Sequence, residues 1–421
     1  MTLKLLLYSH DWAPSVGGVQ TLVMTLARGL ATWSQTHADD SFQVTLVTQT
    51  PPGNMDDGDL PFRVVRRPNS YELLKLMRSA DMIHSAGPAL PPLILGWLLR
   101  KPVVIEHSGY QSVCPNGILV YGPACAPCPG HFMAHHYSSC VRCNARDWGW
   151  YGSLKKTLFT FPRRWLCRRV ARNIAPSHHI SKRIEIPRTQ VIHHGVRRPA
   201  KTITRSAISG RKGPSCFAYV GRLVTEKGIP VLLEAARQLL SNGYSFQLKI
   251  IGDGPERKAL AQMTEAFGLA AVVEFLGTIS NDDIPRIMEG AVAVVMPSIC
   301  EDVVGLVAIE QMMQSRLVIA ADIGGLGETV GECGLKFPAG DAHALASCMR
   351  EVLEHPELAF DAGVRAHARA SSLFSEETML EAHVGTYKDV VPFASSCRPI
   401  IQSPSSPTTM KTNSAGSYKP C

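Results

Sequence analysis

The chain has 421 residues, more than one ordinary domain uses, so its length favours two or three domains. Hydrophobic residues make up 45% and charged residues 19%, which excludes a disordered or fibrous chain. The formal net charge is +8, and because no recognised nucleic-acid-binding motif accompanies it, we expect no nucleic-acid partner. No apolar run approaches the ~20 residues that span a bilayer. We therefore expect a folded cytoplasmic protein.

The first half of the chain alternates short apolar runs with helical patterns. The start, KLLLYSH, predicts a strand rather than a signal peptide, because its apolar run is short and lacks a small-residue cleavage site. After Gly18, apolar residues recur with the spacing of one helix face. QVTLVTQ, ADMIHSAG and KPVVIEHSG predict three more strands. Strands that alternate with helices indicate a parallel sheet with right-handed crossovers.

The turn between the first strand and the first helix contains Gly17 and Gly18. Adjacent glycines let the backbone approach a ligand closely, and N–H groups at the start of a helix bind anions. Ligands on such sheets bind at the carboxyl ends of the strands, where this turn lies. The pair is a candidate anion-binding turn, and an ordinary tight turn has the same composition.

A cysteine-rich segment, residues 114–143, interrupts the pattern. Disulfides are not expected in a cytoplasmic chain, so the twelve cysteines need another explanation. Two C-x2-C pairs predict a structural zinc ion held by four thiolates, which leaves no open position for a substrate. The predicted ligands are Cys125, Cys128, Cys140 and Cys143, and the alternatives are Cys114, His131, His135 and His136. Free thiols in a loop are the competing interpretation.

Basic side chains gather in residues 155–173, KKTLFTFPRRWLCRRVARN. An amphipathic surface helix explains the pattern, and so does contact with anionic lipid or with an acceptor that carries phosphate. If the segment is helical, five arginines share one face: Arg163, Arg164, Arg168, Arg169 and Arg172. Peripheral contact with the inner face of a membrane is therefore one expectation.

A second alternating series starts at CFAYVGRL and continues through QLKIIGDG, VVEFLGTI, AVAVVMPS and RLVIAADIGG. The fold class that follows is α/β, with two doubly wound parallel-sheet domains. We expect the first domain in residues 1–195, a basic, polar linker in 196–215 and the second domain in 216–375. Residues 376–395 are expected to form a helix that packs back on the first domain, and the Ser/Thr/Pro-rich residues 396–421 a disordered tail.

Two cations lie in one turn of the second series, GRLVTEKG. Arg222 offers a planar fork of donors and Lys227 a compact charge, a pair suited to a diphosphate. A surface ion pair with Glu226 is the competing interpretation for either cation.

The segment PSICEDVVGLVAIEQM places acids around a predicted helix start. Gly305 begins this helix after a buried strand, so the amides of Leu306 and Val307 point over the sheet edge, where a phosphate can bind. Between one and two turns later, Glu310 is placed to accept hydrogen bonds from the adjacent hydroxyls of a ribose. A helix-surface glutamate is the alternative, and burial of Glu310 without a partner would cost free energy.

Several short motifs follow one another along the chain: Gly17-Gly18, Gly221-Arg222…Glu226-Lys227-Gly228, Gly252-Asp253-Gly254-Pro255, Phe275-Leu276-Gly277, Pro297-Ser298, the acids that end at Glu310, and Gly324-Gly325. This combination resembles glycosyltransferase family 4, and the resemblance extends to about Val391. It implies a retaining nucleotide-sugar transferase with the GT-B fold, in which two Rossmann-like domains face a central cleft. A similar cysteine-bearing insertion occurs in some members of the family.

The resemblance also implies roles for the residues that bind the donor. Arg222 and Lys227 would hold the diphosphate, and Gly17 and Gly18 would face it from the first domain. Glu310 would be the second acid of the family's E-x7-E motif and would bind the ribose.

The first acid of that motif falls on Asp302, where the family usually has glutamate. Glu301 is the alternative for this role, and neither acid is expected to act as a covalent nucleophile. The nucleobase would lie against Gly277 to Ile279. His107 would lie near the reacting sugar, although a histidine at a strand end is often structural.

The expected reaction transfers a hexose-type sugar from a UDP- or GDP-sugar to a glycan or lipid-linked acceptor, with net retention, in polysaccharide or glycoconjugate biosynthesis. Departure of the nucleotide needs charge stabilisation, which fixed cations and a helix N-terminus supply without a metal. One competing hypothesis is a GT-B-fold epimerase or phosphorylase. Another is a zinc-bearing nucleic-acid-binding protein, which would leave Glu310 and the two cations unexplained.

Overall fold

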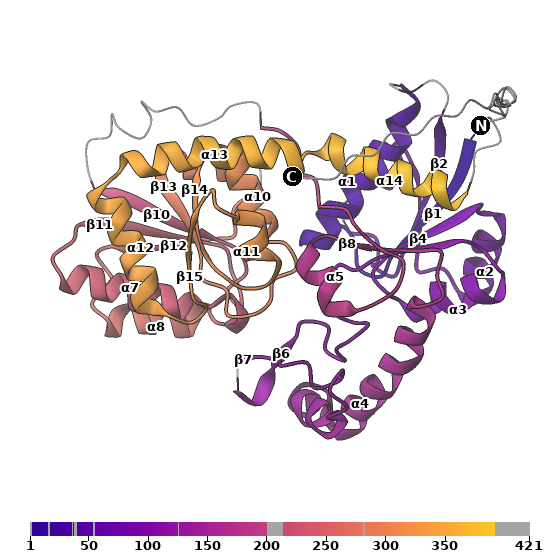
Figure 1. Cartoon of the computed structure of the whole chain (residues 1–421), viewed down its shortest axis with the longest axis horizontal. Helices are drawn as coiled ribbons and strands as arrows, with labels where there is room; N and C mark the ends of the chain where they lie inside the picture. Colours follow the sequence, from indigo (N-terminus) through magenta and orange to yellow (C-terminus); the bar gives the residue numbers. More distant parts are fainter. Residues whose placement is uncertain are drawn as a thin grey trace, which may run out of the picture.

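The computed structural model describes residues 2–391, apart from residues 16, 36, 38–39, 54, 125, 200–213 and 281–282. It contains two α/β domains, each built on its own parallel sheet (Figure 1), which confirms the predicted fold class. Most of the predicted linker and the whole predicted tail, 396–421, lie outside the described residues. In the described ranges, no helix combines the length and the apolar character that a membrane span requires.

The first domain has a seven-stranded sheet in the order β3-β2-β1-β4-β5-β8-β9, and every neighbouring pair of strands is parallel. Its strands are β1 (Thr2–Ser9), β2 (Ser41–Thr48), β3 (Arg63–Arg66), β4 (Met82–Ala86), β5 (Val103–Glu106), β8 (Arg172–Ala175) and β9 (Thr189–Val191).

Alternate residues of β1 point into two separate cores. Leu5 and Leu7 pack with α1 on one face of the sheet, and Leu6 and Tyr8 pack with α2, α3 and α5 on the other. Burial on both faces explains why this strand is a continuous apolar run in the sequence. The helices named here are α1 (Gly18–Thr32), α2 (Ser70–Ser79), α3 (Leu90–Leu98) and α5 (His178–Ile184).

The cysteine-rich segment between β5 and β8 forms a small antiparallel hairpin of β6 (Val120–Tyr121) and β7 (Ala126–Pro127). The long helix α4 (Tyr137–Cys167) follows it, and Gly149, with a left-handed φ of 65°, divides this helix at a kink. In Figure 1 the hairpin and α4 lie below the rest of the first domain.

The five arginines of the basic segment do not share one helix face, so that expectation is wrong. Arg172 begins β8, because α4 has already ended. Arg163 and Arg164 turn inward and donate to the carbonyls of Pro88 and Ile184, at 3.0 and 2.7 Å. Two of the five arginines that we expected on the surface therefore bind backbone carbonyls.

The second domain has a six-stranded parallel sheet in the order β12-β11-β10-β13-β14-β15. Its strands are β10 (Ser215–Val220), β11 (Phe246–Ile251), β12 (Val273–Gly277), β13 (Ala291–Met296), β14 (Leu317–Ala321) and β15 (Leu335–Phe337). Its helices are α7 (Ile229–Ser241), α8 (Arg257–Ala266), α9 (Ile284–Met288), α10 (Leu306–Met313), α11 (Gly324–Val330), α12 (Ala342–Glu354) and α13 (Glu357–Leu373).

The last described helix, α14 (Glu376–Val390), returns to the first domain. A Cβ atom at Gly29 of α1 would lie 2.4 Å from Leu380 Cδ1, so α1 and α14 are in close contact. At the crossing, Val196 N donates to the Phe374 carbonyl at 2.9 Å, so the two segments that connect the domains run side by side. The α14 residues in the core of the first domain are Met379, Leu380, Val384 and Tyr387.

Candidate functional site

A cavity of about 570 Å³ lies between the two domains, next to the carboxyl ends of central strands from both sheets. Gly17 and Gly18 line it from the first domain. From the second domain it is lined by Arg222, Lys227, Ile279, Glu310 and residues 305–307, among others. The structure thus brings the predicted donor-binding residues to one cavity, with the exception of Gly277, which ends β12 just before the lining residue Thr278.

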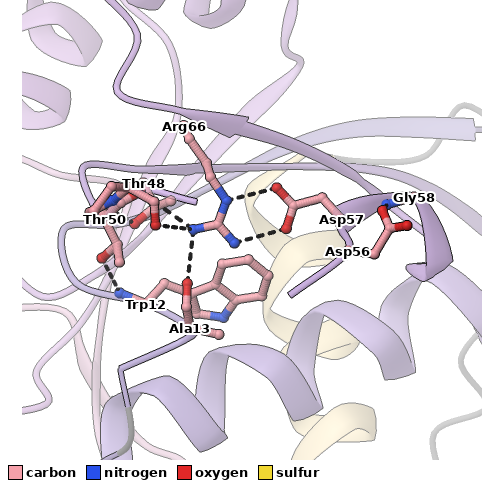
Figure 2. A network of polar contacts seen from close by, with 9 residues as sticks. Trp12, Ala13, Thr48, Thr50, Asp56, Asp57, Gly58 and Arg66 are labelled. Atoms are coloured by element: carbon pink, nitrogen blue, oxygen red, sulfur yellow. Dashed lines mark hydrogen bonds and ion pairs between the residues drawn. The ribbon is translucent and has the colours of Figure 1, made fainter. Parts of the chain in front are cut away.

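Arg66 of β3 holds the loop that leads to the paired glycines. It donates to both carboxylate oxygens of Asp57, at 2.7 and 2.8 Å, and to the Ala13 carbonyl at 2.8 Å (Figure 2). These bonds keep the pKa of Asp57 below its ordinary value. Trp12 lies under the Arg66 guanidinium, and its backbone N donates to Thr50 Oγ1 at 2.8 Å. The loop is therefore anchored to the neighbouring strands before it reaches the cavity.

Gly18 brings the first domain close to the start of α10. A Cβ atom at Gly18 would lie 3.0 Å from Leu306 Cδ1. A larger residue at this position would push against Leu306, so glycine allows the two cavity walls to approach each other.

Lys227 reaches the cavity from the turn after β10. Its Nζ lies 2.6 Å from Asp302 Oδ1, and Ser298 Oγ donates to the other oxygen, Oδ2, also at 2.6 Å. Burial acts to lower the pKa of Lys227, but the Asp302 carboxylate outweighs it, so the pKa lies above its ordinary value. Lys227 therefore stays charged beside the space that a ligand would fill.

The helix α10 begins at the cavity because Gly305 adopts a left-handed conformation, with φ of 79°. A Cβ atom there would lie 2.7 Å from Leu326 Cδ1. The first N–H groups of a helix have no partner within it, so the amides of Leu306 and Val307 are available to an anion.

Glu310 lies one turn further along α10 and lines the same cavity. In the described part of the chain, its carboxylate makes no ion pair and no side-chain hydrogen bond that would offset its burial. Burial raises its pKa to about 7. A buried carboxylate without such a partner on a cavity wall is suited to accept hydrogen bonds from ligand hydroxyls.

Arg222 lies on the rim of the cavity. Its side chain is 72% exposed, and its guanidinium lies 4.0 Å from Glu226. An ion pair this exposed to solvent contributes little free energy. Arg222 is therefore free to turn toward a ligand.

The two adjacent acids, Glu301 and Asp302, point in different directions. Asp302 lines the cavity, whereas Glu301 contacts α5 of the first domain, with His179 Nε2 at 2.8 Å and the Arg183 guanidinium at 3.0 Å. Burial acts to raise the pKa of Glu301, and contacts with His179 and Arg183 bring it below its ordinary value. The structure therefore places Asp302, and not Glu301, where the first acid of the pair would meet a ligand.

His107 does not reach the cavity in this structure. Its side chain is fully buried, and its Nε2 pairs with Asn173 Oδ1 at 2.9 Å. Burial lowers its pKa to about 4, so it is a neutral core histidine. The next residue, Ser108, lines the cavity instead.

The predicted zinc ligands are described only in part. Cys125 lies outside the described residues. Within the described residues, Cys128, Cys140 and Cys143 do not form a group with sulfur atoms all within 4.8 Å of one another. Burial and, to a smaller extent, the neighbouring thiols, which include Cys114, raise the pKa of Cys140 to about 12. The zinc site stays a prediction.

Ser298, Ser108 and His194 belong to the cavity region without having been assigned from the sequence. Ser298 was part of a quoted motif, and its position four residues before Asp302 was a usable signal. Ser108 and His194 come from first-domain loops, where a strand end was the only hint.

In sequence, the comparisons cover less than half of the chain. The family model for glycosyl transferases group 1 matches residues 201–369. The chain is 30% identical over 174 residues to alpha-D-kanosaminyltransferase of Streptomyces kanamyceticus, which is 41% of this chain and 45% of that protein. It is 31% identical over 179 residues to glycogen synthase of Mycobacterium tuberculosis, which is 42% and 43% of the two chains. The matches thus span less than half the length of these relatives.

In structure, the similarity covers both domains. Anabaena Alr3699/HepE in complex with UDP and glucose superposes with a TM-score of 0.68 at 19% identity, covering 92% of this chain and 100% of that one. Sucrose-phosphate synthase from Thermosynechococcus elongatus also gives a TM-score of 0.68, at 21% identity, covering 92% and 99%. At identities this low, the structural similarity establishes the fold alone. Residues 201–369 therefore match the family model for glycosyl transferases group 1, and the chain has the GT-B fold of these solved structures.

Proposed function

We propose that the chain is a retaining glycosyltransferase that moves a sugar from a nucleotide-sugar donor to a hydroxyl of a glycan or lipid-linked acceptor. The observation that carries this proposal is the position of Lys227, the start of α10 and Glu310 on one cavity. A cation and a helix N-terminus suit a diphosphate, and a carboxylate without a partner suits the hydroxyls of a ribose. The similarity to a kanosaminyltransferase and a glycogen synthase supports sugar transfer.

Cleavage of the donor leaves negative charge on the departing diphosphate. Lys227 and the amides of α10 are fixed before the reaction, so they stabilise that charge without reorganisation. Asp302 is held by Lys227 and Ser298 through its two oxygens, and it acts as a positioning residue for the cation. We therefore expect the acceptor hydroxyl to attack from the face that the diphosphate leaves. The departing phosphate oxygen takes the hydroxyl proton, and the anomeric configuration is retained.

UDP is the donor nucleotide that we propose, because a protein of the same fold has been solved with UDP and glucose. In a panel of UDP-, GDP- and ADP-sugars, we expect the UDP-sugar to give the largest rise in Tm. A ligand at 100 times its Kd stabilises a protein by about 2.7 kcal/mol, which is several degrees in Tm for a domain of this size. A larger shift with a GDP-sugar would correct the donor base. No shift with any of them would contradict the proposed function.

The first domain carries an exposed apolar surface. Of the thirteen large apolar side chains that are exposed in the described residues, ten lie on α3 and α4, which are in contact with each other. We call this surface the α3–α4 face. Its residues are Ile94, Trp97, Leu98, Trp150, Tyr151, Leu154, Leu158, Phe159, Phe161 and Trp165.

Exposed cations accompany these rings. Arg169 lies 3.7 Å from the centre of the Trp165 ring, and Lys155 lies 5.8 Å from that of Phe159. Aromatic side chains next to lysine and arginine suit the surface of an anionic bilayer, where the rings enter the headgroup region and the cations meet lipid phosphates. We therefore assign this face to an anionic membrane surface, which would bring the enzyme to a lipid-linked acceptor.

The membrane assignment is tested with anionic and neutral vesicles. Replacing Trp150, Tyr151 and Leu154 together by serine should lower binding to anionic vesicles by about 100-fold, because three apolar side chains no longer leave water. Tyr71→Ser removes an equally exposed ring from α2 and should leave binding unchanged. Both variants should keep the thermal shift with UDP-sugar. The measurement is sedimentation of the protein with the vesicles. If the triple variant and the unmodified chain sediment equally with anionic vesicles, this face does not bind the membrane.

We also keep the cysteine-rich segment as a proposed zinc site, with Cys128 and Cys140 among the ligands. The support is the two C-x2-C pairs in the sequence and the burial of both of these thiols. Elemental analysis should find zinc in the purified chain, and Cys140→Ser should lose one equivalent of it. Cys333→Ser, in the second domain, is the control that should lose none. A folded protein that carries no zinc would refute the site.

A further inference from the structure

A buried cluster of one glutamate and three histidines lies inside the first domain. Glu106 ends β5, His84 lies in β4, His383 lies in α14, and His194 follows β9. Their exposed fractions are 0%, 0%, 0% and 4%. Polar groups this deep need partners, because burial without them costs free energy.

The ligand atoms of this cluster lie at distances that suit one ion. Glu106 Oε2 lies 3.3 Å from His84 Nε2 and 3.6 Å from His383 Nε2. Within the described residues, these three side chains form a group whose ligand atoms all lie within 4.8 Å of one another. Around a tetrahedral ion with metal–ligand bonds of about 2.0–2.1 Å, neighbouring ligand atoms are about 3.3 Å apart.

The same atoms form close ion pairs, but these contacts lack the geometry of hydrogen bonds. Both oxygens of Glu106 and the Nε2 atoms of His84, His194 and His383 are buried, and within the described part of the chain none of them makes a well-aligned hydrogen bond. Close approach without alignment is expected when the lone pairs of nitrogen and oxygen point toward a common ion instead of toward each other.

His383 provides a further detail. Its Nδ1 lies 2.8 Å from the Met379 carbonyl, which can only accept, so the proton is on Nδ1. In the neutral ring, Nε2 then presents its lone pair to the Glu106 carboxylate, and the two repel each other. A cation between them removes the repulsion. A ring N–H that donates to a backbone carbonyl is also the usual second contact of a histidine that binds metal.

We propose that His84, His383 and Glu106 bind a zinc ion that joins the returning helix α14 to the first sheet. His2Glu is a ligand set that zinc uses, and Glu106 can contribute one or both oxygens. His194 lies 3.1 Å from Glu106 Oε1 and also lines the interdomain cavity, so the cluster supports a wall of that cavity. Because the ligands are sealed from solvent, the role of the ion is structural.

The test uses the full chain loaded with cobalt in place of zinc. Cobalt held by imidazole and carboxylate shows visible d–d bands without the thiolate-to-cobalt charge-transfer band of a cysteine site, so the two proposed sites are distinguishable. We expect these d–d bands in the unmodified chain and in Cys140→Ser. Introduced into the Cys140→Ser chain, in which only the histidine site is left to bind cobalt, His383→Gln should lose these bands, together with one equivalent of zinc. His355→Gln, which changes an exposed histidine of the second domain, should keep both.

Measurements on the Cys140→Ser chain, which keeps only the histidine site, decide the question if His383→Gln does not fold. Because metal binding stabilises the folded state, a strong chelator should lower the Tm, and added zinc should restore it. Purified protein whose only cobalt spectrum is that of thiolate ligands, and whose Cys140→Ser variant shows no change in Tm with chelator or zinc, would overturn the proposal. Hydrogen bonds and a protonated histidine would then hold the cluster.

Discussion

Lys227→Ala is expected to abolish the thermal shift with UDP-sugar and to lower the rate of UDP release from the donor by about 100–1000-fold. The reason is that Lys227 is the cation fixed against the cavity by Asp302, at 2.6 Å, and it cannot be replaced by solvent without reorganisation. The measurements are a melting curve with and without donor and an assay of UDP released into solution.

Two matched variants make this expectation specific. Lys258→Ala removes an exposed lysine from α8 of the same domain and should change neither measurement. Arg222→Ala removes the exposed cation at the rim and should have a smaller effect, about tenfold, because solvent already screens that charge. If Lys227→Ala binds UDP-sugar as the unmodified chain does, the diphosphate lies elsewhere and the proposed mechanism fails.

The sequence predicted the cavity because its parts lie at strand ends. In a parallel sheet all carboxyl ends meet at one edge, so turns that are far apart in the chain, such as those of Gly18 and Lys227, come together once the strands are identified. Glu310 was predictable for a similar reason, since helical spacing from Gly305 fixes which edge it faces.

Other features depend on contacts that periodicity does not encode. The conformation of one turn determines whether Glu301 or Asp302 faces the cavity. Glu301 faces away because it forms ion pairs with α5 of the first domain. His107 is drawn into the core by Asn173, a partner 66 residues away. The Glu106 cluster gathers side chains from β4, β5 and α14, whose proximity follows only from the return of the last helix.

Glu310→Gln is expected to act in two opposite ways. It should weaken binding of UDP-sugar by about 10–100-fold, because hydrogen bonds from hydroxyls to a charged carboxylate contribute roughly 1.5–3 kcal/mol. A donor analogue without the two ribose hydroxyls is the matched ligand, and variant and unmodified chain should bind it equally. Glu289→Gln changes an exposed glutamate of the same domain and should leave both affinities unchanged. A variant that still prefers the natural ribose would show that Glu310 does not bind it.

Without ligand, the same substitution should stabilise the protein, and the sign follows from burial. The pKa of Glu310 is raised to about 7 in the folded chain, whereas a glutamate in the unfolded chain ionises near pH ~4.3. Between these values the folded state holds a proton that the unfolded state has lost, so stability falls as pH rises through this window. The penalty is fully present above about pH 7, where it is at most about 4 kcal/mol, and it is absent below about pH 4. The Tm gain of Glu310→Gln should therefore be largest near pH 8 and nearly vanish near pH 4. A Tm gain that does not change with pH would mean that the Glu310 carboxylate already has a hydrogen-bond or ion-pair partner in the folded chain. Such a carboxylate would not need the hydroxyls of a ribose as partners.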